Sequence, residues 1–248
     1  MNPLAPSLPA TLLRDGYAIV PDVIDDVPLT RLVSTLQEMN RGPEVRTRGA
    51  KTYAVRNLMR NVPEVRRLAS SDEMRALTVP AVGEGARAVR AILFDKTPEA
   101  NWKVAWHQDL SIAVRARAEV PGYGPWSEKA GVVHVQPPAE LLANMITVRL
   151  HLDDCGPESG PLQVLPGSHA HGVLSPAEIE RWRAFVEPVS CNVARGGVVL
   201  MRPLLLHASS SAVRPGHRRV IHLEYAAARL PAGLEWYEPH ETIEPKDS

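Results

Sequence analysis

The feature that most restricts the fold of this chain is a short pattern, His107-x-Asp109, together with a distant counterpart, His207. Successive side chains of a β-strand point to opposite faces, so His107 and Asp109 share one face while Gln108 turns to the other. His207 follows His107 by 100 residues. The three side chains can hold one metal ion only if the fold brings a second strand alongside the first. Two imidazoles and one carboxylate with open coordination positions are typical of non-haem Fe(II) oxygenases.

The segments after the second histidine add two further polar groups. His207 ends an apolar run over 198–206, and Ser209 lies two residues on, facing the same way if the strand continues. Arg218 begins another strand-like run after a Pro-Gly turn signal at 215–216. Two strands joined as a hairpin would bring a metal ligand, a hydroxyl and a guanidinium together. A histidine that ends an apolar run is equally compatible with a hydrogen-bonded core residue.

Short strands dominate the chain after a helical beginning. Apolar residues recur at helical spacing over 29–39, and Ser71 begins a second helix. Ser175 and Glu178 form a capping-box start for a later helix. We expect strands over 89–95, 102–110, 147–153, 161–165, 187–193, 197–201, 204–209 and 218–226. Many short strands with 23 prolines and 16 glycines predict a mainly β fold with flanking helices, a double-stranded β-helix of the jelly-roll or cupin-like type.

The segment 147–153 alternates strictly between polar and apolar residues. Its polar positions are Thr147, Arg149, His151 and Asp153, and its apolar positions are Val148, Leu150 and Leu152. We expect the apolar face to pack against helices and the polar face to look into the mouth of the barrel. Arg149 would then lie near a bound co-substrate or substrate. A polar face that simply meets solvent is the alternative.

At this point the chain resembles the phytanoyl-CoA dioxygenase family of Fe(II)/2-oxoglutarate-dependent oxygenases. The resemblance covers roughly residues 12–228. It rests on LRDGYAIVPDVID near the start, ILFDKTP before the His-x-Asp pattern, GPLQVLPGSHAHG in the middle, and HAS with Arg218 near the end. It implies an enzyme that uses iron, 2-oxoglutarate and dioxygen to hydroxylate a small-molecule substrate, with release of succinate and CO2.

The resemblance also implies roles for individual residues. The iron ligands would be His107, Asp109 and His207, which are also the catalytic centre. Four residues would contact 2-oxoglutarate: Arg218 and Ser209 at its distal carboxylate, and Arg149 and Ile92, the latter as an apolar wall.

The stretch 111–146 is the main departure from the family pattern, since it is long and shows no periodicity. Long irregular segments inside compact domains are often lids or binding loops. We expect it to form a lid or substrate insert within a single domain spanning 1–248, with Trp126 and His134 nearest the substrate. Tyr53 and Arg56 are further substrate candidates. A surface excursion without function, and a solvated strand or loop at Tyr53, are the alternatives.

Composition narrows the classes of partner. The chain has 28 basic and 28 acidic residues and zero formal net charge, which argues against an obligatory nucleic-acid or polybasic membrane partner. No window approaches the roughly 20 apolar residues of a membrane span, and the first residues do not read as a secretory signal. We therefore expect a cytoplasmic enzyme with free thiols at Cys155 and Cys191. The oligomeric state is left open.

Two other classes of function remain compatible with the barrel. One is a cupin-type metal enzyme that does not use 2-oxoglutarate, although such sites usually recruit three or four histidines and would leave Arg218 without a role. The other is a metal-free, non-catalytic binding protein, against which the complete ligand set speaks.

Overall fold

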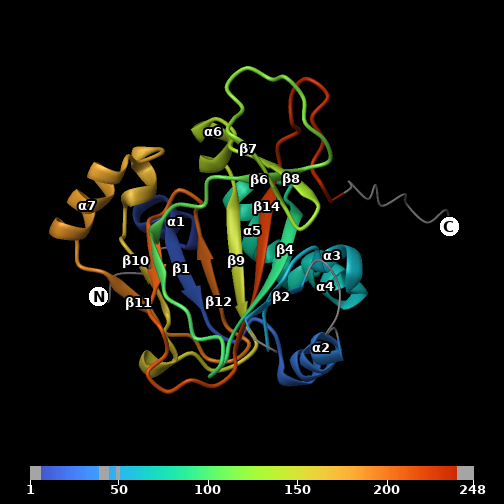
Figure 1. The fold of residues 1–248 in the computed structure, drawn as a ribbon, viewed down its shortest axis with the longest axis vertical. Coiled ribbons are helices and arrows are strands. Elements are labelled where there is room, and N and C mark those ends of the chain that lie inside the picture. The colour runs from blue at the N-terminus through green and yellow to red at the C-terminus, as the bar shows by residue number, and fades with distance from the viewer. Residues whose placement is uncertain (1–6, 39–44, 49–50, 239–248) are drawn as a thin grey trace.

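The computed structural model describes residues 7–38, 45–48 and 51–238, and of 45–48 and 51–53 it describes the backbone alone (Figure 1). The helices are α1 Leu8–Asp15, α2 Asp26–Glu38, α3 Leu58–Asn61, α4 Pro63–Ala69, α5 Asp72–Val82, α6 Ala139–Ala143 and α7 Pro176–Phe185. The strands are β1 Tyr17–Val20, β2 Val45–Arg48, β3 Lys51–Val55, β4 Arg87–Lys96, β5 Val104–His107, β6 Ile112–Val114, β7 Trp126–Lys129, β8 Val132–Val135, β9 Ile146–His151, β10 Leu162–Val164, β11 Val189–Cys191, β12 Val198–Met201, β13 His207–Ser209 and β14 Arg218–Ala226.

A seven-stranded antiparallel sheet forms the back of the molecule, in the order β1-β12-β9-β14-β4-β3-β2. One face of this sheet carries the apolar side chains of its strands, including Val148, Leu150 and Leu223, and packs against helices α1 to α5. Leu12, Leu29 and Met74 of those helices are fully buried there. Burial of one such side chain contributes about 1.5–3 kcal/mol to the free energy of unfolding, so packing on this face stabilises the sheet. Polar residues can then occupy the other face.

A second sheet, in the order β11-β10-β13-β5, lies against the inner face of the first. Its β13 pairs with β5, with His207 directly opposite His107. Lys96 of β4 donates to Ser209 of β13 across the two sheets, over 3.1 Å. The predicted jelly-roll architecture is therefore confirmed. The hairpin expected between 204–209 and 218–226 is wrong, because β13 and β14 belong to opposing sheets and the chain crosses between them.

The stretch 111–146 has regular secondary structure, contrary to the prediction of an irregular segment. It forms a third antiparallel sheet, β6-β8-β7, followed by α6. One face of this sheet contributes Ile112, Val114 and Val135 to an apolar cluster that also holds Leu142 and Trp236. Its strands are only three or four residues long, too short for a period of two to be visible in the sequence.

The predicted helices are confirmed with shifted ends. The helix expected over 29–39 begins at Asp26, and α5 begins after Ser71, whose hydroxyl accepts from Met74 N. The capping box of α7 is present, since Ser175 accepts from Glu178 N while the Glu178 carboxylate accepts from Ser175 N. Among the described residues, no helix is long and apolar enough to cross a membrane. Both cysteines are free, as expected, and both are buried.

Candidate metal centre and co-substrate pocket

His107, Asp109 and His207 come together at one end of the second sheet. Each offers one ligand atom, and these atoms all lie within 4.8 Å of one another. Asp109 Oδ1 lies 3.8 Å from His107 Nε2, and Asp109 Oδ2 lies 3.6 Å from His207 Nε2. Within the part of the chain that is described, Asp109 Oδ2 is buried and has no hydrogen-bond partner. The distant histidine thus joins the local pair, as the sequence pattern requires.

The strand that carries the first two ligands is shorter than the predicted 102–110. Strand β5 ends at His107, and Asp109 lies just beyond it, held by a bond from its N–H to Pro203 O at 2.9 Å. Gln108 turns away from the ligands as expected. Its amide donates to Gly172 O and Leu204 O and accepts from Leu174 N. These bonds fix the backbone between the two ligands.

Both histidines present Nε2 to the site. Nδ1 of His107 lies 2.8 Å from Ala105 O, and Nδ1 of His207 lies 2.9 Å from Leu205 O. A carbonyl oxygen can only accept, so each Nδ1 carries a proton and Nε2 is the ring nitrogen left to bind a ligand. A metal-ligating histidine commonly uses one nitrogen for the metal while the other donates in this way.

The protonation states also suit a cation. Burial lowers the pKa of His207 to about 4, so its imidazole is neutral at neutral pH. Burial alone would raise the pKa of Asp109, but its interactions with the neighbouring imidazoles, His207 foremost, hold it well below the usual range. Two imidazoles and one carboxylate form a donor set suited to Fe(II).

The inner face of the large sheet is unusually polar. His222 lies opposite Ile92 in β4 and opposite Arg149 in β9, so the three side chains share this face. Arg149 donates to His222 Nδ1 over 2.9 Å, and His222 Nε2 lies 3.3 Å from Glu224 Oε1. Arg149 and Ile92 are both buried where the alternation of their strands places them. The polar face of β9 therefore looks into the barrel and not into solvent.

Asp153 was expected to face the mouth of the barrel with the other polar positions of 147–153, and this expectation is wrong. Strand β9 ends at His151, so the alternation does not continue to residue 153. Asp153 instead accepts from the backbone N–H and from the guanidinium of Arg219, with two contacts of 2.8 Å. This pair lies at the end of the sheet and takes no part in the interior.

Arg218 and Ser209 are both buried and come from opposing sheets, and Lys96 connects them. Arg218 is 4 % exposed and donates to Gly160 O. Lys96, directly opposite Arg218 in β4, donates to Ser209 Oγ and to Ser210 O. Burial, and then the positive charge of Arg218, lower the pKa of both Lys96 and Arg149. Lys96 thus links the Ser209 hydroxyl to a part of the interior that also holds the buried side chains of Arg218 and Arg149.

The sequence interpretation missed Lys96, whereas it placed His151 on the inner face of its strand. Lys96 stands in the segment ILFDKTP, and its position four residues after Ile92 on the same strand could have placed it on the inner face. His151 is 1 % exposed, and neither of its ring nitrogens has a hydrogen-bond partner among the described residues. Burial, then the nearby Arg149 and Arg218, lower its pKa to about 3.

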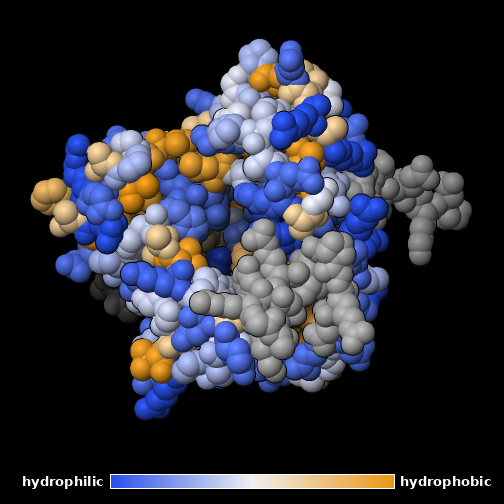
Figure 2. Space-filling model, in the orientation of Figure 1, coloured by the Kyte–Doolittle hydropathy of each residue, from blue (hydrophilic) through white to orange (hydrophobic). Residues whose placement is uncertain are grey.

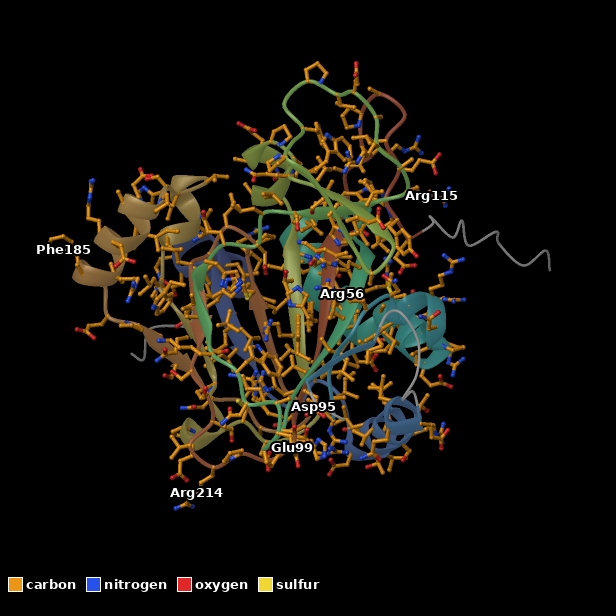
Figure 3. All side chains as sticks on the ribbon, in the orientation of Figure 1. Arg56, Asp95, Glu99, Arg115, Phe185 and Arg214 are labelled. Carbon is orange, nitrogen blue, oxygen red and sulfur yellow. The ribbon has the colours of Figure 1, made fainter. Side chains whose placement is uncertain are left out.

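Trp126 and His134, two of the four substrate candidates, lie on opposite faces of the small sheet. Trp126 lies opposite Val135 and packs into the apolar cluster of the small sheet, while it also lines an open surface hollow with Arg117 and Tyr123. His134 is on the other face of β8 and is buried. Arg56 lies near the centre of the view in Figure 3, whereas Arg115 and Phe185 lie at its periphery. The side chain of Tyr53 lies outside the described residues.

The surface in Figure 2 is hollowed near the centre of the face that is shown, where β9 lies in Figure 1. This hollow opens between the two large sheets. The metal ligands are on the sheet that contains β5, and the polar inner face belongs to the sheet that contains β9 and β14.

Comparison with known proteins finds one matching family model and several solved structures of similar fold. The family model described as phytanoyl-CoA dioxygenase matches residues 12–220. No curated protein matches the chain. The solved structures that it resembles include the non-haem, alpha-ketoglutarate-dependent epimerase SnoN from nogalamycin biosynthesis, at 20 % identity and TM-score 0.66, covering 88 % of this chain and 80 % of SnoN.

Two further structures are similar. EctD from S. alaskensis has 18 % identity and TM-score 0.69, with 88 % of this chain and 75 % of EctD covered. AviO1 from Streptomyces viridochromogenes has 26 % identity and TM-score 0.61, with 87 % of this chain and 91 % of AviO1 covered. EctD has also been crystallised with Fe and with 2-oxoglutarate and 5-hydroxyectoine. At these identities the likeness to SnoN and EctD shows a shared fold.

Proposed function

This chain belongs to the phytanoyl-CoA dioxygenase family, and on that premise we propose that it is a non-haem oxygenase that uses Fe(II), 2-oxoglutarate and dioxygen to hydroxylate a small molecule. Succinate and CO2 would be the co-products. The observation that carries the proposal is the pairing of two sites within one barrel. The His107, Asp109 and His207 cluster offers a cation site, and the Arg218, Lys96 and Ser209 pocket offers a carboxylate site.

The donor set decides what the first site can hold. His107 and His207 would ligate through Nε2, since each Nδ1 is engaged by a backbone carbonyl. Asp109 would supply the single negative charge. Three protein ligands leave positions open for the co-substrate and dioxygen. When bound, Fe(II) supplies the redox chemistry that couples decarboxylation of 2-oxoglutarate to oxidation of the substrate.

The protein's own contribution is positioning and charge. Arg218 would bind the distal carboxylate of 2-oxoglutarate, with Ser209 donating its hydroxyl and Lys96 adding a second cation. Arg149 and Ile92 would flank the co-substrate from the inner face of the large sheet, where both are buried. We also propose that the sheet β6-β8-β7 covers the substrate entrance, since it directly follows the strand that carries His107.

The proposal is tested by anaerobic titration of the protein with Fe(II) and then 2-oxoglutarate, followed by visible absorption. Chelation of iron by 2-oxoglutarate produces a charge-transfer band, which we expect only when both are present. Iron binding without this band would indicate a metal enzyme of another kind on the same barrel. No iron binding would indicate a metal-free binding protein.

Affinity for 2-oxoglutarate is expected to depend on pH through Lys96. Burial, then the positive charges of Arg218 and Arg149, lower the pKa of this amine to about 7. A bound carboxylate favours the ammonium form and raises that pKa again. Below pH 7 the amine is already charged and affinity is at its maximum, and as the pH rises above about 7 the affinity should fall because binding must then take up a proton.

The measurement is the dissociation constant of 2-oxoglutarate across this pH range at saturating Fe(II). Lys96→Met should weaken binding at low pH and flatten the profile. If the variant and the wild-type protein show parallel profiles, another group is responsible.

A further inference from the structure

Strand β9 has polar groups without a hydrogen-bond partner at each of its inner-face positions. It lies between β12 and β14 in the large sheet, and all six of its residues are buried. Thr147 Oγ1, Arg149 Nε and both ring nitrogens of His151 are buried without a partner among the described residues. Buried polar atoms normally have a partner, so this side of β9 is suited to a polar ligand and not to an apolar core.

His151 has no role in the function proposed above, although strand pairing places it beside the co-substrate pocket. It is directly opposite Val220 in β14, and Arg218 is two residues from Val220 on the same face. Arg149 precedes His151 by two residues and shares that face as well. Diagonal neighbours on one face of a sheet are within reach of long or aromatic side chains. His151 is therefore next to both arginines on the inner face.

The distal end of the co-substrate pocket follows from the pairing of the other strands. Ser209 is two residues beyond the proposed metal ligand His207 in β13, roughly 7 Å along the strand. Lys96 donates to Ser209 Oγ and lies directly opposite Arg218. A five-carbon dicarboxylate would therefore have one end at the metal and the other at Arg218, which is the arginine diagonal to His151.

The unpartnered atoms around His151 include hydrogen-bond donors of both arginines. Arg218 donates to Gly160 O and Arg149 donates to His222 Nδ1, yet the Nε of each is buried without a partner in the described part of the chain. A guanidinium nitrogen can only donate, and a carboxylate can only accept and has sites for several donors. A ligand carboxylate matches this set of groups better than a hydroxyl or an amide does.

His151 itself would act as a neutral group. It is 1 % exposed, and burial, followed by the positive charges of Arg149 and Arg218, lowers the pKa of its imidazole to about 3. A neutral imidazole carries one N–H donor and one acceptor nitrogen. Leaving this donor unbonded in the protein interior is unfavourable, and a ligand that accepts from it removes that cost.

We propose that His151 donates a hydrogen bond to the distal carboxylate of 2-oxoglutarate, beside Arg218, and so helps to select a dicarboxylate as co-substrate. This inference rests on the proposed function, since it adds a specificity-determining contact to the co-substrate site. The contribution of His151 is a directed hydrogen bond without charge, whereas Arg218 and Lys96 contribute positive charge.

The experiment compares the binding of two 2-oxo acids. 2-Oxoglutarate and 2-oxopentanoate have the same five-carbon chain, but the second has a methyl group in place of the distal carboxylate. Each is titrated to saturation, without dioxygen, into protein loaded with Fe(II), and the dissociation constant is taken from the charge-transfer band. We expect His151→Leu to weaken binding of 2-oxoglutarate by about 10-fold, because a hydrogen bond to a charged group is lost. Binding of 2-oxopentanoate should not change.

Further variants separate this contact from a role in folding. His151→Gln keeps an N–H donor and should retain most of the affinity for 2-oxoglutarate. Ligand-free His151→Leu should unfold at a temperature no lower than the wild-type protein, because no hydrogen bond of the imidazole to a described residue is lost. His169→Leu is the matched control, since His169 Nδ1 is also buried without a partner among the described residues but lies beside Gly16, after α1. It should bind both acids as the wild-type protein does.

The inference is overturned if His151→Leu leaves the affinity for 2-oxoglutarate unchanged, or if it weakens both acids equally, which would indicate a structural role. A lower unfolding temperature of ligand-free His151→Leu, or a His151→Gln variant as weak as His151→Leu, would also contradict it. The wild-type titration tests the proposed function separately, because absence of the band with 2-oxoglutarate contradicts that function. A normal wild-type band with unchanged selectivity in His151→Leu contradicts this inference alone.

Discussion

Replacing His107 or His207 by alanine is expected to abolish Fe(II) binding and succinate formation while leaving the fold intact. Each imidazole supplies one Nε2, and the ligand atoms of the cluster converge within 4.8 Å, so removal of one leaves an incomplete donor set. The loss in affinity should exceed the roughly 10–100-fold that typically follows loss of a hydrogen-bond partner to a metal ligand. Neither Nε2 is engaged in the strand pairing of β5 and β13, so the sheet does not depend on them.

The measurement combines Fe(II) titration with circular dichroism. His171→Ala is the matched control, because His171 is an exposed histidine that contacts Trp182 away from the cluster. Wild-type iron affinity in either ligand variant would show that the three residues do not form the metal centre. Loss of the folded signal would show that the histidines serve the core instead, which is the alternative that the apolar run before His207 left open.

Arg218→Ala should raise the apparent KM for 2-oxoglutarate by about 10-fold or more, and Arg219→Ala should raise it only weakly. A hydrogen bond to a charged group contributes about 1.5–3 kcal/mol, and a guanidinium can donate two in parallel to one carboxylate. Arg218 is 4 % exposed and shares the interior pocket with Lys96 and Ser209. Arg219 is committed to Asp153 at the end of the sheet.

Both variants are measured at saturating Fe(II), with thermal stability followed in parallel. Arg219→Ala is expected to lower stability more than it alters KM, because Asp153 loses its paired charge. The reverse ranking of the two KM values would contradict the observed facing of β14. An unchanged KM in both variants would show that neither arginine binds 2-oxoglutarate.

The site could be predicted where it follows from alternation along one strand. Side-chain alternation separates Arg218 from Arg219, and the structure shows this. Alternation also predicts that His107 and Asp109 come together and that Gln108 turns away. The structure shows both, but strand β5 ends at His107, and the hydrogen bonds of Gln108 and of Asp109 N–H fix the residues beyond it. The same rule failed at Asp153, since the strand ends before that residue.

Helix α1, Leu8–Asp15, is not among the helices expected from the sequence, although its boundaries carry recognisable signals. Its segment carries Pro9 in the first turn and ends at Gly16, which adopts a positive φ of 80°. Proline at the start and glycine at the end of a helix are ordinary boundary signals. Its single fully buried residue, Leu12, left too little apolar periodicity for the helix to be recognised.

The sequence by itself determined which residues share a face, because side-chain alternation depends only on local backbone geometry. Tertiary structure decided which faces meet. The placement of β13 and β14 in opposing sheets and the contact of Lys96 with Ser209 depend on strand pairings between distant segments. Such pairings are selected by burial of the whole apolar surface against the helices and between the sheets, and no local pattern encodes that global balance.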